Sequence, residues 1–412
     1  MKDKICVALV NACTAPIPDV LGGGAERLVT MLLDENEIEN KIDLIVFSKQ
    51  NKLAENESLK YHRSKIIYIS PSTVRDKFMK ILYKIFSRFG LYRKHYGYYS
   101  RVASYLKRFN VDVLIDENGY VPDFKEAVDV VGVEKTVAHI HWLVNPIKRD
   151  IQNNYRYAMG VSNYITDYWI KNSGNNEIIG KTVYSAVDEK RFLRTITENE
   201  REELKRKLGI PNNSCVVAYC GRIHEQKGPL ELYKAFKKIY SKKLNATLLF
   251  IGGSDKMGSQ LSEYHINLLN EAEDNKSVIF TGYIKNKDLY KYYQISDILV
   301  IPTLVEEAAG LVAIEGMLSG LPIIATRSGG LPEYVNEKCS ILINKDDRMQ
   351  EELCLALEKL ILDLNLRKKM SACAVKEGEK YTQKKYYNSF VNSVLDIVKE
   401  EKEYVRKKTT TY

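Results

Sequence analysis

Short apolar runs alternate with helical stretches along the first half of the chain. Runs this short and this apolar are typical of strands in a parallel sheet that is buried on both faces. We predict seven such strands, at residues 4–10, 42–48, 66–70, 111–116, 136–141, 159–162 and 182–184.

A second series of the same kind follows residue 200. Its strands are predicted at residues 215–221, 247–252, 278–282, 298–302, 322–326 and 341–343, with helices between them, for example at residues 229–240, 260–273, 288–295 and 311–318. Strand–helix alternation in two blocks predicts an α/β protein with two Rossmann-like, doubly wound domains. A chain of 412 residues has room for two domains of ordinary size.

The domain boundary is expected where the first series ends. Between residues 186 and 200 a strand gives way to a charged helix at residues 198–208. We therefore expect an N-terminal domain at residues 1–186 and a C-terminal domain at residues 187–381. Residues 382–412 are predicted to form an amphipathic helix and a charged tail that cross back to the N-terminal domain.

The composition is that of a globular protein, with 45% hydrophobic and 28% charged residues. No uninterrupted apolar stretch reaches about 18 residues, the length that a membrane-spanning helix needs. The start of the chain lacks the long apolar core of a secretion signal, so we expect a cytoplasmic protein. Seven cysteines without paired spacing fit a reducing compartment better than a disulfide framework or a zinc site.

The net charge of +9 is concentrated in one segment. Between Lys60 and Phe109 there are thirteen Lys or Arg residues and a single acid, Asp76. Within this segment four cations recur three or four residues apart on one face of a predicted helix, with aromatic and aliphatic residues largely elsewhere around it: Lys77, Lys80, Lys84 and Arg88. Such a helix can lie on an anionic membrane with its apolar side dipping in.

We therefore predict that the basic segment at residues 60–108 faces the inner surface of the cell membrane. The alternative is a helix that packs its apolar side on the N-terminal domain and leaves a solvated basic face. Nucleic acid, the other partner that a basic patch suggests, is not expected because the sequence contains no nucleic-acid-binding motif.

A glycine-rich loop follows the first predicted strand. Gly22, Gly23 and Gly24 precede a helix, so the backbone could approach an anion that the free N–H groups of the helix start would bind. The loop does not match the dinucleotide fingerprint, because Arg27 stands where its last glycine belongs, and it is not a P-loop. A plain loop and helix cap explains the same residues equally well.

Two cations follow the first strand of the second series. Arg222 and Lys227 lie in a loop bounded by Gly221 and Gly228. An arginine can grip a phosphate through two hydrogen bonds, and a lysine adds a compact charge. For either residue alone, a surface ion pair with Glu225 is the simpler interpretation.

Two glutamates flank a predicted helix start further along the chain. Glu307 lies in the loop after a strand, and Glu315 lies about one turn into the helix that follows Gly310. The N–H groups of Leu311 and Val312 should be free to bind a ligand oxygen. A carboxylate accepts two hydroxyl hydrogens at once, as a sugar diol requires. The helix dipole alone favours one Glu near a helix start, but it does not explain the cations of the earlier loop.

Together these motifs resemble the retaining family-4 glycosyltransferases of the GT-B fold, in which two Rossmann-like domains face each other across a cleft. The E-x7-E motif with G-G-x-P-E downstream is the specific part of the resemblance, and the glycine-rich loop is the weak part. The matching segments occur in the expected order between Gly22 and Val335: GGGAERLV, GRIHEQKG, the E-x7-E motif from Glu307 to Glu315, and SGLPIIATRSGGLPEYV.

The resemblance implies a role for each matching residue. Arg222 and Lys227 would neutralise the diphosphate of a nucleotide-sugar donor. Glu307 would hold hydroxyls of the transferred sugar, and Glu315 would hold the ribose diol. Further donor-binding groups would be Gly23 and Gly24 near the diphosphate, the backbone around Tyr283 and Ile284 at the base, Gly310, and the N–H groups of Leu311 and Val312.

His141 matches the histidine that faces the donor sugar from the N-terminal domain. His139 is the less favoured choice, and two neighbouring histidines leave that assignment open.

The family also implies a reaction. A hexose would pass from a nucleotide-diphosphate sugar, with UDP as the expected nucleotide, to a glycan or polyprenyl-diphosphate-linked acceptor, with retention of configuration, as in polysaccharide assembly at the cell envelope. No D-x-D motif is present, and two cations are available to stabilise the leaving group. Neither a metal nor another cofactor is therefore expected.

Two departures from the family pattern leave the sugar and the acceptor open. Ala308-Ala309 stand where Pro-Phe is common, and Ser185-Ala186 stand where Asn-Gly is common. Two other functions also stay open. One is a soluble glucan or disaccharide synthase on the same fold, and the other is a catalytically silent subunit that binds a sugar nucleotide or a membrane.

Overall fold

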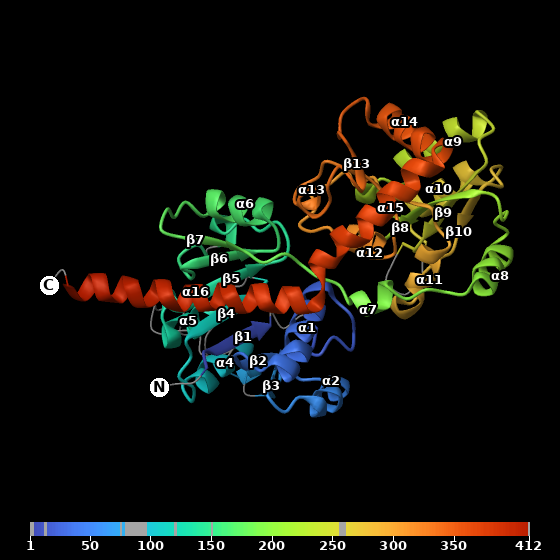
Figure 1. Cartoon of the computed structure of the whole chain (residues 1–412). Helices are drawn as coiled ribbons and strands as arrows, with labels where there is room; N and C mark the ends of the chain where they lie inside the picture. Colours follow the sequence, from blue (N-terminus) through green and yellow to red (C-terminus); the bar gives the residue numbers. More distant parts are fainter. Residues whose placement is uncertain are drawn as a thin grey trace. The chain divides into compact units, whose positions relative to one another are not determined.

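The computed structural model describes residues 4–11, 15–74, 76–78, 97–118, 122–149, 151–254 and 261–410. Contacts divide the chain into two compact units, each with its own sheet (Figure 1). The first unit comprises Met1–Ser185 together with Gln383–Tyr412, and the second comprises Ala186–Thr382.

The first unit contains a seven-stranded parallel sheet in the order β3-β2-β1-β4-β5-β6-β7. Its strands are β1 (Cys6–Asn11), β2 (Asp43–Lys49), β3 (Lys65–Ile69), β4 (Val113–Glu117), β5 (Thr136–Ile140), β6 (Tyr157–Gly160) and β7 (Ile179–Thr182). Every residue of β1, β4 and β5 is buried, including the polar Asp116, Glu117 and His139 near the carboxyl ends of β4 and β5. The strand order reverses between β1 and β4, and doubly wound sheets bind ligands beside the carboxyl ends of strands at such a point.

Helices cover both faces of this sheet. The helices α1 (Gly24–Glu39) and α16 (Gln383–Thr410) pack against each other, and α4 (Tyr98–Leu106) packs against α5 (Lys125–Val131). Figure 1 shows α16 running along the first unit. The hydroxyl of Tyr387 fastens it to α1, because it donates to Asn36 at 2.6 Å and accepts from the N–H of Lys41 at 3.2 Å. Among the residues that the structure describes, this unit also contains the helices α2 (Lys52–Glu57) and α6 (Asn163–Ser173).

The second unit contains a six-stranded parallel sheet in the order β10-β9-β8-β11-β12-β13. Here the order reverses between β8 and β11. Its strands are β8 (Cys215–Cys220), β9 (Ala246–Ile251), β10 (Val278–Phe280), β11 (Ile298–Ile301), β12 (Ile323–Thr326) and β13 (Ser340–Ile343).

The second sheet is also covered by paired helices. The helix α9 (Pro229–Ser241) packs against α14 (Met349–Leu362), and α12 (Leu311–Leu318) packs against α15 (Leu364–Gly378). Apolar side chains of α9 and α14 form one buried cluster with those of β8, β9 and β11. The described part of this unit also contains α7 (Glu189–Phe192), α8 (Glu198–Leu208), α10 (Glu263–Ala272), α11 (Leu289–Gln294) and α13 (Leu331–Tyr334).

The predicted fold class is confirmed, because both units are doubly wound α/β structures with parallel sheets. Predicted strand positions agree with the observed ones to within two or three residues. The largest difference concerns β7, which was predicted at residues 182–184 and is observed at Ile179–Thr182. This edge strand is only partly buried, so its apolar pattern is weak.

Most of the predicted membrane helix lies outside the described residues. Of its four cations only Lys77 is described, and Lys80, Lys84 and Arg88 are not. Other parts of the basic segment belong to the fold: β3 joins the sheet, α4 packs on α5, and Arg101 binds both carboxylate oxygens of Asp76 at 2.8 Å.

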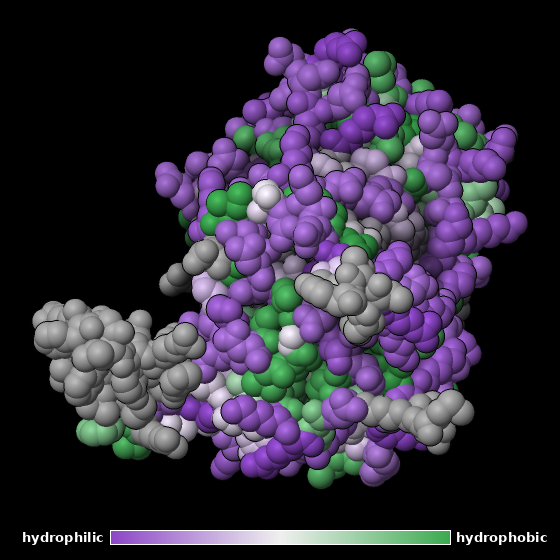
Figure 2. Space-filling view, turned by 90° about the vertical axis from the view of Figure 1, so that its left-hand side faces the viewer, coloured by the Kyte–Doolittle hydropathy of each residue, from purple (hydrophilic) through white to green (hydrophobic). Residues whose placement is uncertain are grey.

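The described surface near this segment carries exposed apolar side chains. Val74 is 85% exposed and Phe78 is 61% exposed. The face drawn in Figure 2 is largely hydrophilic, with apolar patches between the polar residues. Among the helices that the structure describes, none is long and apolar enough to cross a membrane.

Two glycines with left-handed backbones provide a test of how closely the second unit is packed. Gly228 has φ of +66°, and a Cβ there would overlap the carbonyl oxygen of Pro302 after β11. Gly209 has φ of +73°, and among the described residues nothing lies within 4 Å of an added Cβ. We expect Gly209→Ala to lower the free energy of unfolding by about 1 kcal/mol. Gly228→Ala should lower it by roughly 1–3 kcal/mol more, because Pro302 must move.

Urea unfolding of both variants and the wild type measures the two losses. Equal losses would contradict the close approach of the loop at Gly228 to the end of β11.

Candidate functional site

The two loops predicted to bind the donor diphosphate and sugar lie side by side in the second unit. One follows β8 and the other follows β11, which are neighbouring strands at the point where the strand order reverses. The carbonyl of Gln226 in the first loop accepts hydrogen bonds from the second loop, from the N–H of Leu304 at 2.9 Å and the hydroxyl of Thr303 at 3.2 Å. The backbones of the two loops are thus joined directly.

Lys227 and Glu307 meet across this junction. The ammonium of Lys227, at the end of the 3₁₀ helix η6 (Glu225–Lys227), lies 2.5 Å from Oε1 of Glu307. The side chains remain 31% and 20% exposed, so both charges face solvent that a ligand could replace. The structure therefore brings together two predicted site residues that are 80 positions apart in the sequence.

The glycine pair at Gly329 and Gly330 holds the backbone of Glu307. The N–H of Gly330 donates to the carbonyl of Glu307 at 2.7 Å. A Cβ at Gly329 would overlap that same carbonyl oxygen. The downstream glycines of the predicted motif thus position its first glutamate.

Arg222 lies in the same loop as Lys227, and its side chain is exposed. Its carbonyl accepts a hydrogen bond of 2.5 Å from the hydroxyl of Tyr219. Among the described residues its guanidinium makes no ion pair, so the surface pair with Glu225 that the sequence left open does not form. The guanidinium is available to an anionic ligand.

Glu315 occupies a different environment from Glu307. It lies in α12, and its Oε2 accepts a hydrogen bond of 2.9 Å from the hydroxyl of Tyr293, a fully buried residue of α11. Burial raises the pKa of Glu315 to about 7, although the Tyr293 hydrogen bond and the charge of Arg191 oppose the rise. Sequence reasoning missed Tyr293, because nothing in its local pattern sets it apart from a core tyrosine.

The loop after β11 leads into the start of α12 (Leu311–Leu318), which has no side-chain cap. Gly310 is the N-cap, and a glycine has no side chain with which to cap the helix. The N–H groups of Leu311 and Val312 have no acceptor inside the helix.

Tyr283 and Ile284 lie in the loop after β10, at the same carboxyl edge of the sheet. In this loop the carbonyl of Gly282 accepts a hydrogen bond of 3.1 Å from the N–H of Gly252.

The glycine-rich loop of the first unit ends in a helix start, as predicted. Gly23 precedes α1 with φ of +137°. The buried carboxylate of Glu26 lies so close that a Cβ at Gly23 would overlap it. The side chain of Glu26 therefore lies at the helix start where the donor diphosphate was predicted to bind. Arg27 forms an ion pair of 3.2 Å with Asp19.

The two candidate histidines of the first unit differ in exposure. His139 lies in β5 and is fully buried, whereas His141 lies just after β5 with 10% of its side chain exposed. Both rings contact the fully buried carboxylate of Glu117 at the end of β4, at 2.9 Å from Nδ1 of His139 and 2.5 Å from Nε2 of His141. The difference in exposure supports the choice of His141, which stays a prediction.

Glu117 was missed by sequence reasoning, although a signal was present. It is a charged residue at the carboxyl end of a strand that was predicted from its apolar pattern, and such residues are site candidates in parallel sheets. Burial alone would raise the pKa of Glu117, but the charges and hydrogen bonds of His139 and His141 outweigh burial and lower it to about 2. Glu117 is therefore ionised at neutral pH.

The same three side chains are the group among the described residues that could hold a metal ion. Their donor atoms all lie within 4.8 Å of one another, and two imidazoles with one carboxylate suit a divalent transition metal. In this structure direct hydrogen bonds join them. The expectation that no metal is needed stays a prediction.

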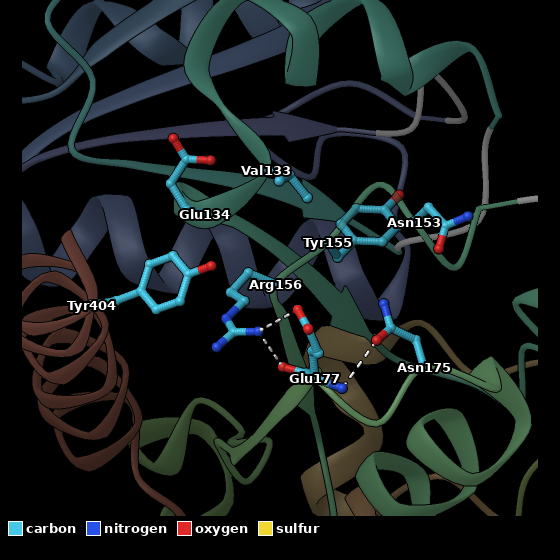
Figure 3. Close-up of a pocket in the computed structure, with 8 residues that line it drawn as sticks. All are labelled: Val133, Glu134, Asn153, Tyr155, Arg156, Asn175, Glu177 and Tyr404. Atoms are coloured by element: carbon cyan, nitrogen blue, oxygen red, sulfur yellow. Dashed lines mark hydrogen bonds and ion pairs between the residues drawn. The ribbon is translucent and has the colours of Figure 1, made fainter. Parts of the chain in front are cut away.

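A cavity of about 350 Å³ lies elsewhere in the first unit, at the amino ends of β5, β6 and β7 (Figure 3). Its cation, Arg156, donates to the carbonyl and the carboxylate of Glu177 at 2.7 and 3.3 Å, and lies 5.1 Å from the ring centroid of Tyr404. Glu134 adds a second carboxylate to the lining. A cavity with a paired cation and two carboxylates does not suit a diphosphate, and it lies at the opposite edge of the sheet from His141.

The loops after β8 and β11 lie in a region that matches a known protein family. Residues 200–377 match the family described as Glycosyl transferases group 1. The matched region contains all four of the charged residues predicted to bind the donor: Arg222, Lys227, Glu307 and Glu315.

Curated relatives match over a similar length. A lipopolysaccharide 1,2-N-acetylglucosaminetransferase of Salmonella typhimurium is 27% identical over 204 residues, which is 49% of this chain and 51% of that protein. A D-inositol 3-phosphate glycosyltransferase of Corynebacterium jeikeium is 31% identical over 189 residues, 45% of this chain and 44% of that protein. The chain therefore spans about half the length of the curated relatives that it matches.

Solved structures match over nearly the whole chain. A glycosyltransferase of Rickettsia africae has a TM-score of 0.73 at 20% identity and covers 97% of this chain and 99% of its own. An Anabaena protein in complex with UDP and glucose has a TM-score of 0.67 at 16% identity, with the same coverage. At these identities the likeness concerns the fold, and it confirms the predicted GT-B class of two Rossmann-like domains.

The raised pKa of Glu315 predicts how pH affects stability. Because its folded pKa of about 7 exceeds the ordinary value of 4.5, the carboxyl holds its proton more tightly in the folded chain than in the unfolded chain. Stability is therefore lost as pH rises through this interval, by up to ~3 kcal/mol. Glu315→Gln cannot ionise, so between pH 4 and pH 8 the wild type should lose stability relative to this variant.

Urea unfolding of both proteins at the two pH values measures this difference. Parallel pH dependence of the two unfolding free energies would show that Glu315 is not held protonated by the fold.

Proposed function

We propose that the protein is a hexosyltransferase that moves a hexose from a nucleotide-diphosphate sugar, with UDP as the nucleotide, to a hydroxyl of a glycan or lipid-linked acceptor. The observation that carries the proposal is the contact of Lys227 with Glu307 in the loop that leads into α12, which brings a cation and a carboxylate near the uncapped N–H groups of a helix start. The names of relatives support it, since one is a lipopolysaccharide 1,2-N-acetylglucosaminetransferase and another was solved with UDP and glucose.

The main chemical task is to stabilise the charge that grows on the leaving diphosphate. In this proposal Arg222, Lys227 and the first N–H groups of α12 bind the diphosphate oxygens. These groups are fixed by loops that are hydrogen-bonded to each other, so little reorganisation accompanies the reaction. Two cations and a helix start supply this charge without a metal.

Binding of the donor would break the contact between Lys227 and Glu307. Lys227 would turn from Glu307 to the diphosphate, and Glu307 would accept hydroxyl hydrogens of the hexose. Glu315 would hold the ribose diol, and His141 would face the hexose. The acceptor hydroxyl would attack the face that the leaving group occupies, with the departing phosphate taking its proton, so that configuration is retained.

Removing either cation should slow the reaction. We expect Arg222→Ala and Lys227→Ala each to reduce turnover about 10²- to 10³-fold, or roughly 3–4 kcal/mol in activation free energy, as for a single preorganised electrostatic group. Slow hydrolysis of UDP-glucose by the purified protein provides the readout. Lys242→Ala is a matched control, because it removes another Lys–Glu contact of the second unit, the 2.6 Å pair with Glu358.

Near-native rates in both cation variants would contradict the assignment of Arg222 and Lys227 to the diphosphate of the donor. A wild-type protein that binds UDP-sugars without hydrolysing or transferring them would instead favour the silent binding subunit.

We further propose that the protein works at the inner face of the cell membrane, where a lipid-linked acceptor would be available. The basic segment supports this, because it contains the exposed Val74 and Phe78 as well as the predicted basic face. Arg101 is already neutralised by Asp76, so the attraction would come from the other cations of the segment.

Charge reversal tests the membrane proposal. We expect anionic liposomes to pellet the wild type and to lose most of this binding when Lys80, Lys84 and Arg88 are all changed to Glu. A triple change of Lys237, Lys238 and Lys243 to Glu alters the net charge equally at exposed positions of the second unit and should leave binding intact. Binding that survives the first set of changes would favour the soluble synthase.

A further inference from the structure

Tyr293 holds one side of the Glu315 carboxylate. Its hydroxyl donates a hydrogen bond of 2.9 Å to Oε2 of Glu315, and this bond joins α11 to α12. Burial, followed by the influence of the nearby Cys220, raises the pKa of Tyr293 well above its ordinary value, so the hydroxyl keeps the hydrogen that it donates. Oε1 of Glu315 has no hydrogen-bond partner among the described residues, and the residue is partly exposed. One carboxylate oxygen is therefore held by the protein, and the other is available to a ligand.

Both partners of this hydrogen bond lie on closely packed elements. The side chain of Tyr293 is fully buried, and its ring centroid lies 5.9 Å from that of Phe192 in α7. Gly316, the residue after Glu315, lets α12 lie close to β11, because a Cβ there would overlap the side chain of Leu299. Close packing leaves side chains few alternative rotamers. The geometry of the hydrogen bond is therefore fixed before any ligand binds.

The need of a buried tyrosine for a partner explains only part of this arrangement. A buried hydroxyl usually finds an acceptor, and a backbone carbonyl is sufficient for that purpose. In the same unit, for example, the buried Tyr233 donates to the carbonyl of Glu271 at 2.5 Å. Tyr293 instead contacts a carboxylate, whose removal from water is costly. A carboxylate with one fixed and one open oxygen favours a role in binding.

We propose that Tyr293 is a positioning residue, which prevents the Glu315 carboxylate from rotating and thereby gives the site a preference for a ribonucleotide over a deoxyribonucleotide. The identity of the ligand rests on the proposed function, in which Glu315 holds the ribose diol. Tyr293 itself does not touch the ligand, because its side chain is fully buried and its hydroxyl is used by Glu315.

The preference follows from the hydrogen bonds that a fixed carboxylate can make. Oε1 and the remaining lone pair of Oε2 accept hydrogens from the 2′- and 3′-hydroxyls of a ribose. When a deoxyribose lacks one of these hydroxyls, a fixed carboxylate loses a hydrogen bond and cannot turn toward another partner. A carboxylate that rotates freely could bind water instead, so the missing hydroxyl would cost less affinity. Discrimination between the two sugars therefore depends on Tyr293.

Calorimetric titration of the full chain with UDP and with 2′-deoxy-UDP tests the proposal. At pH 8 the pH exceeds the pKa of Glu315 of about 7, so the carboxylate of the wild type is mainly ionised. We expect the wild type to bind UDP at least about tenfold more tightly than 2′-deoxy-UDP. Tyr293→Phe removes only the hydroxyl and should lower this ratio of affinities by roughly three- to tenfold, mainly by weakening UDP.

Two results of this titration would overturn the proposal. One is equal affinity of the wild type for the two nucleotides. The other is an unchanged ratio in Tyr293→Phe, in a protein with wild-type near-UV circular dichroism. The lowered ratio should also persist at pH 9, because the Tyr293 bond lowers the pKa of Glu315 and its loss would raise that pKa. A ratio that recovers at pH 9 would assign the effect to protonation and contradict the positioning role.

Tyr233→Phe is the matched control, because it removes another buried tyrosine hydroxyl of the second unit whose partner is a backbone carbonyl. This variant should keep the wild-type ratio. A double-mutant cycle locates the effect. In a Glu315→Ala background there is no carboxylate to hold, so Tyr293→Phe should cause no further change in the ratio. An equal decrease in both backgrounds would contradict the proposal.

Hydrolysis of UDP-glucose separates this role from that of the cations. The ribose contact is the same in the ground state and the transition state, so Tyr293→Phe should raise KM and leave kcat nearly unchanged. A loss of kcat at unchanged KM would contradict the positioning role. A wild type that binds neither nucleotide would contradict the proposed function and this inference with it. UDP binding whose discrimination does not depend on Tyr293 would contradict this inference alone.

Discussion

The hydrogen-bonded pairing of β8 with β11 is the constraint on which the candidate site of the second unit depends. These strands are far apart in the sequence, but they are neighbours in the sheet and run in the same direction. The loops that follow β8 and β11 must therefore leave the sheet at the same carboxyl edge, on the two sides of the point where the strand order reverses. The contact of Lys227 with Glu307 and the bonds to the carbonyl of Gln226 are consequences of that pairing.

Much of the fold could be predicted because its signals are local. Short, largely apolar runs marked most strands of both sheets, and Pro229 and the glycine before Leu311 marked two helix starts that the structure confirms. The edge strand β7 was misplaced because it is only partly buried and carries little pattern. The order of the strands was not readable from any run of residues, since pairing is decided between segments and not within them.

The candidate site was predictable to the extent that its residues follow strands. Arg222, Lys227, Glu307 and Glu315 were recognisable because charged residues and glycines cluster after apolar runs in a known spacing. Tyr293 and Glu117 were missed because their importance lies in hydrogen bonds to partners that are distant in the sequence. The two glutamates of the motif also proved unlike each other. The ammonium group of Lys227 neutralises the partly exposed Glu307, whereas burial favours the protonated form of Glu315.

The first unit is formed by two separate parts of the chain, and this affects the order in which the protein can fold during synthesis. This unit combines the first part of the chain with α16, which is synthesised only after the whole of the second unit. Until then, the face of the first sheet that carries His139 lacks the helix that contributes Phe390, and Asn36 lacks the hydroxyl of Tyr387. On a ribosome the second unit can finish folding first, and the N-terminal half must wait for the C-terminal helix.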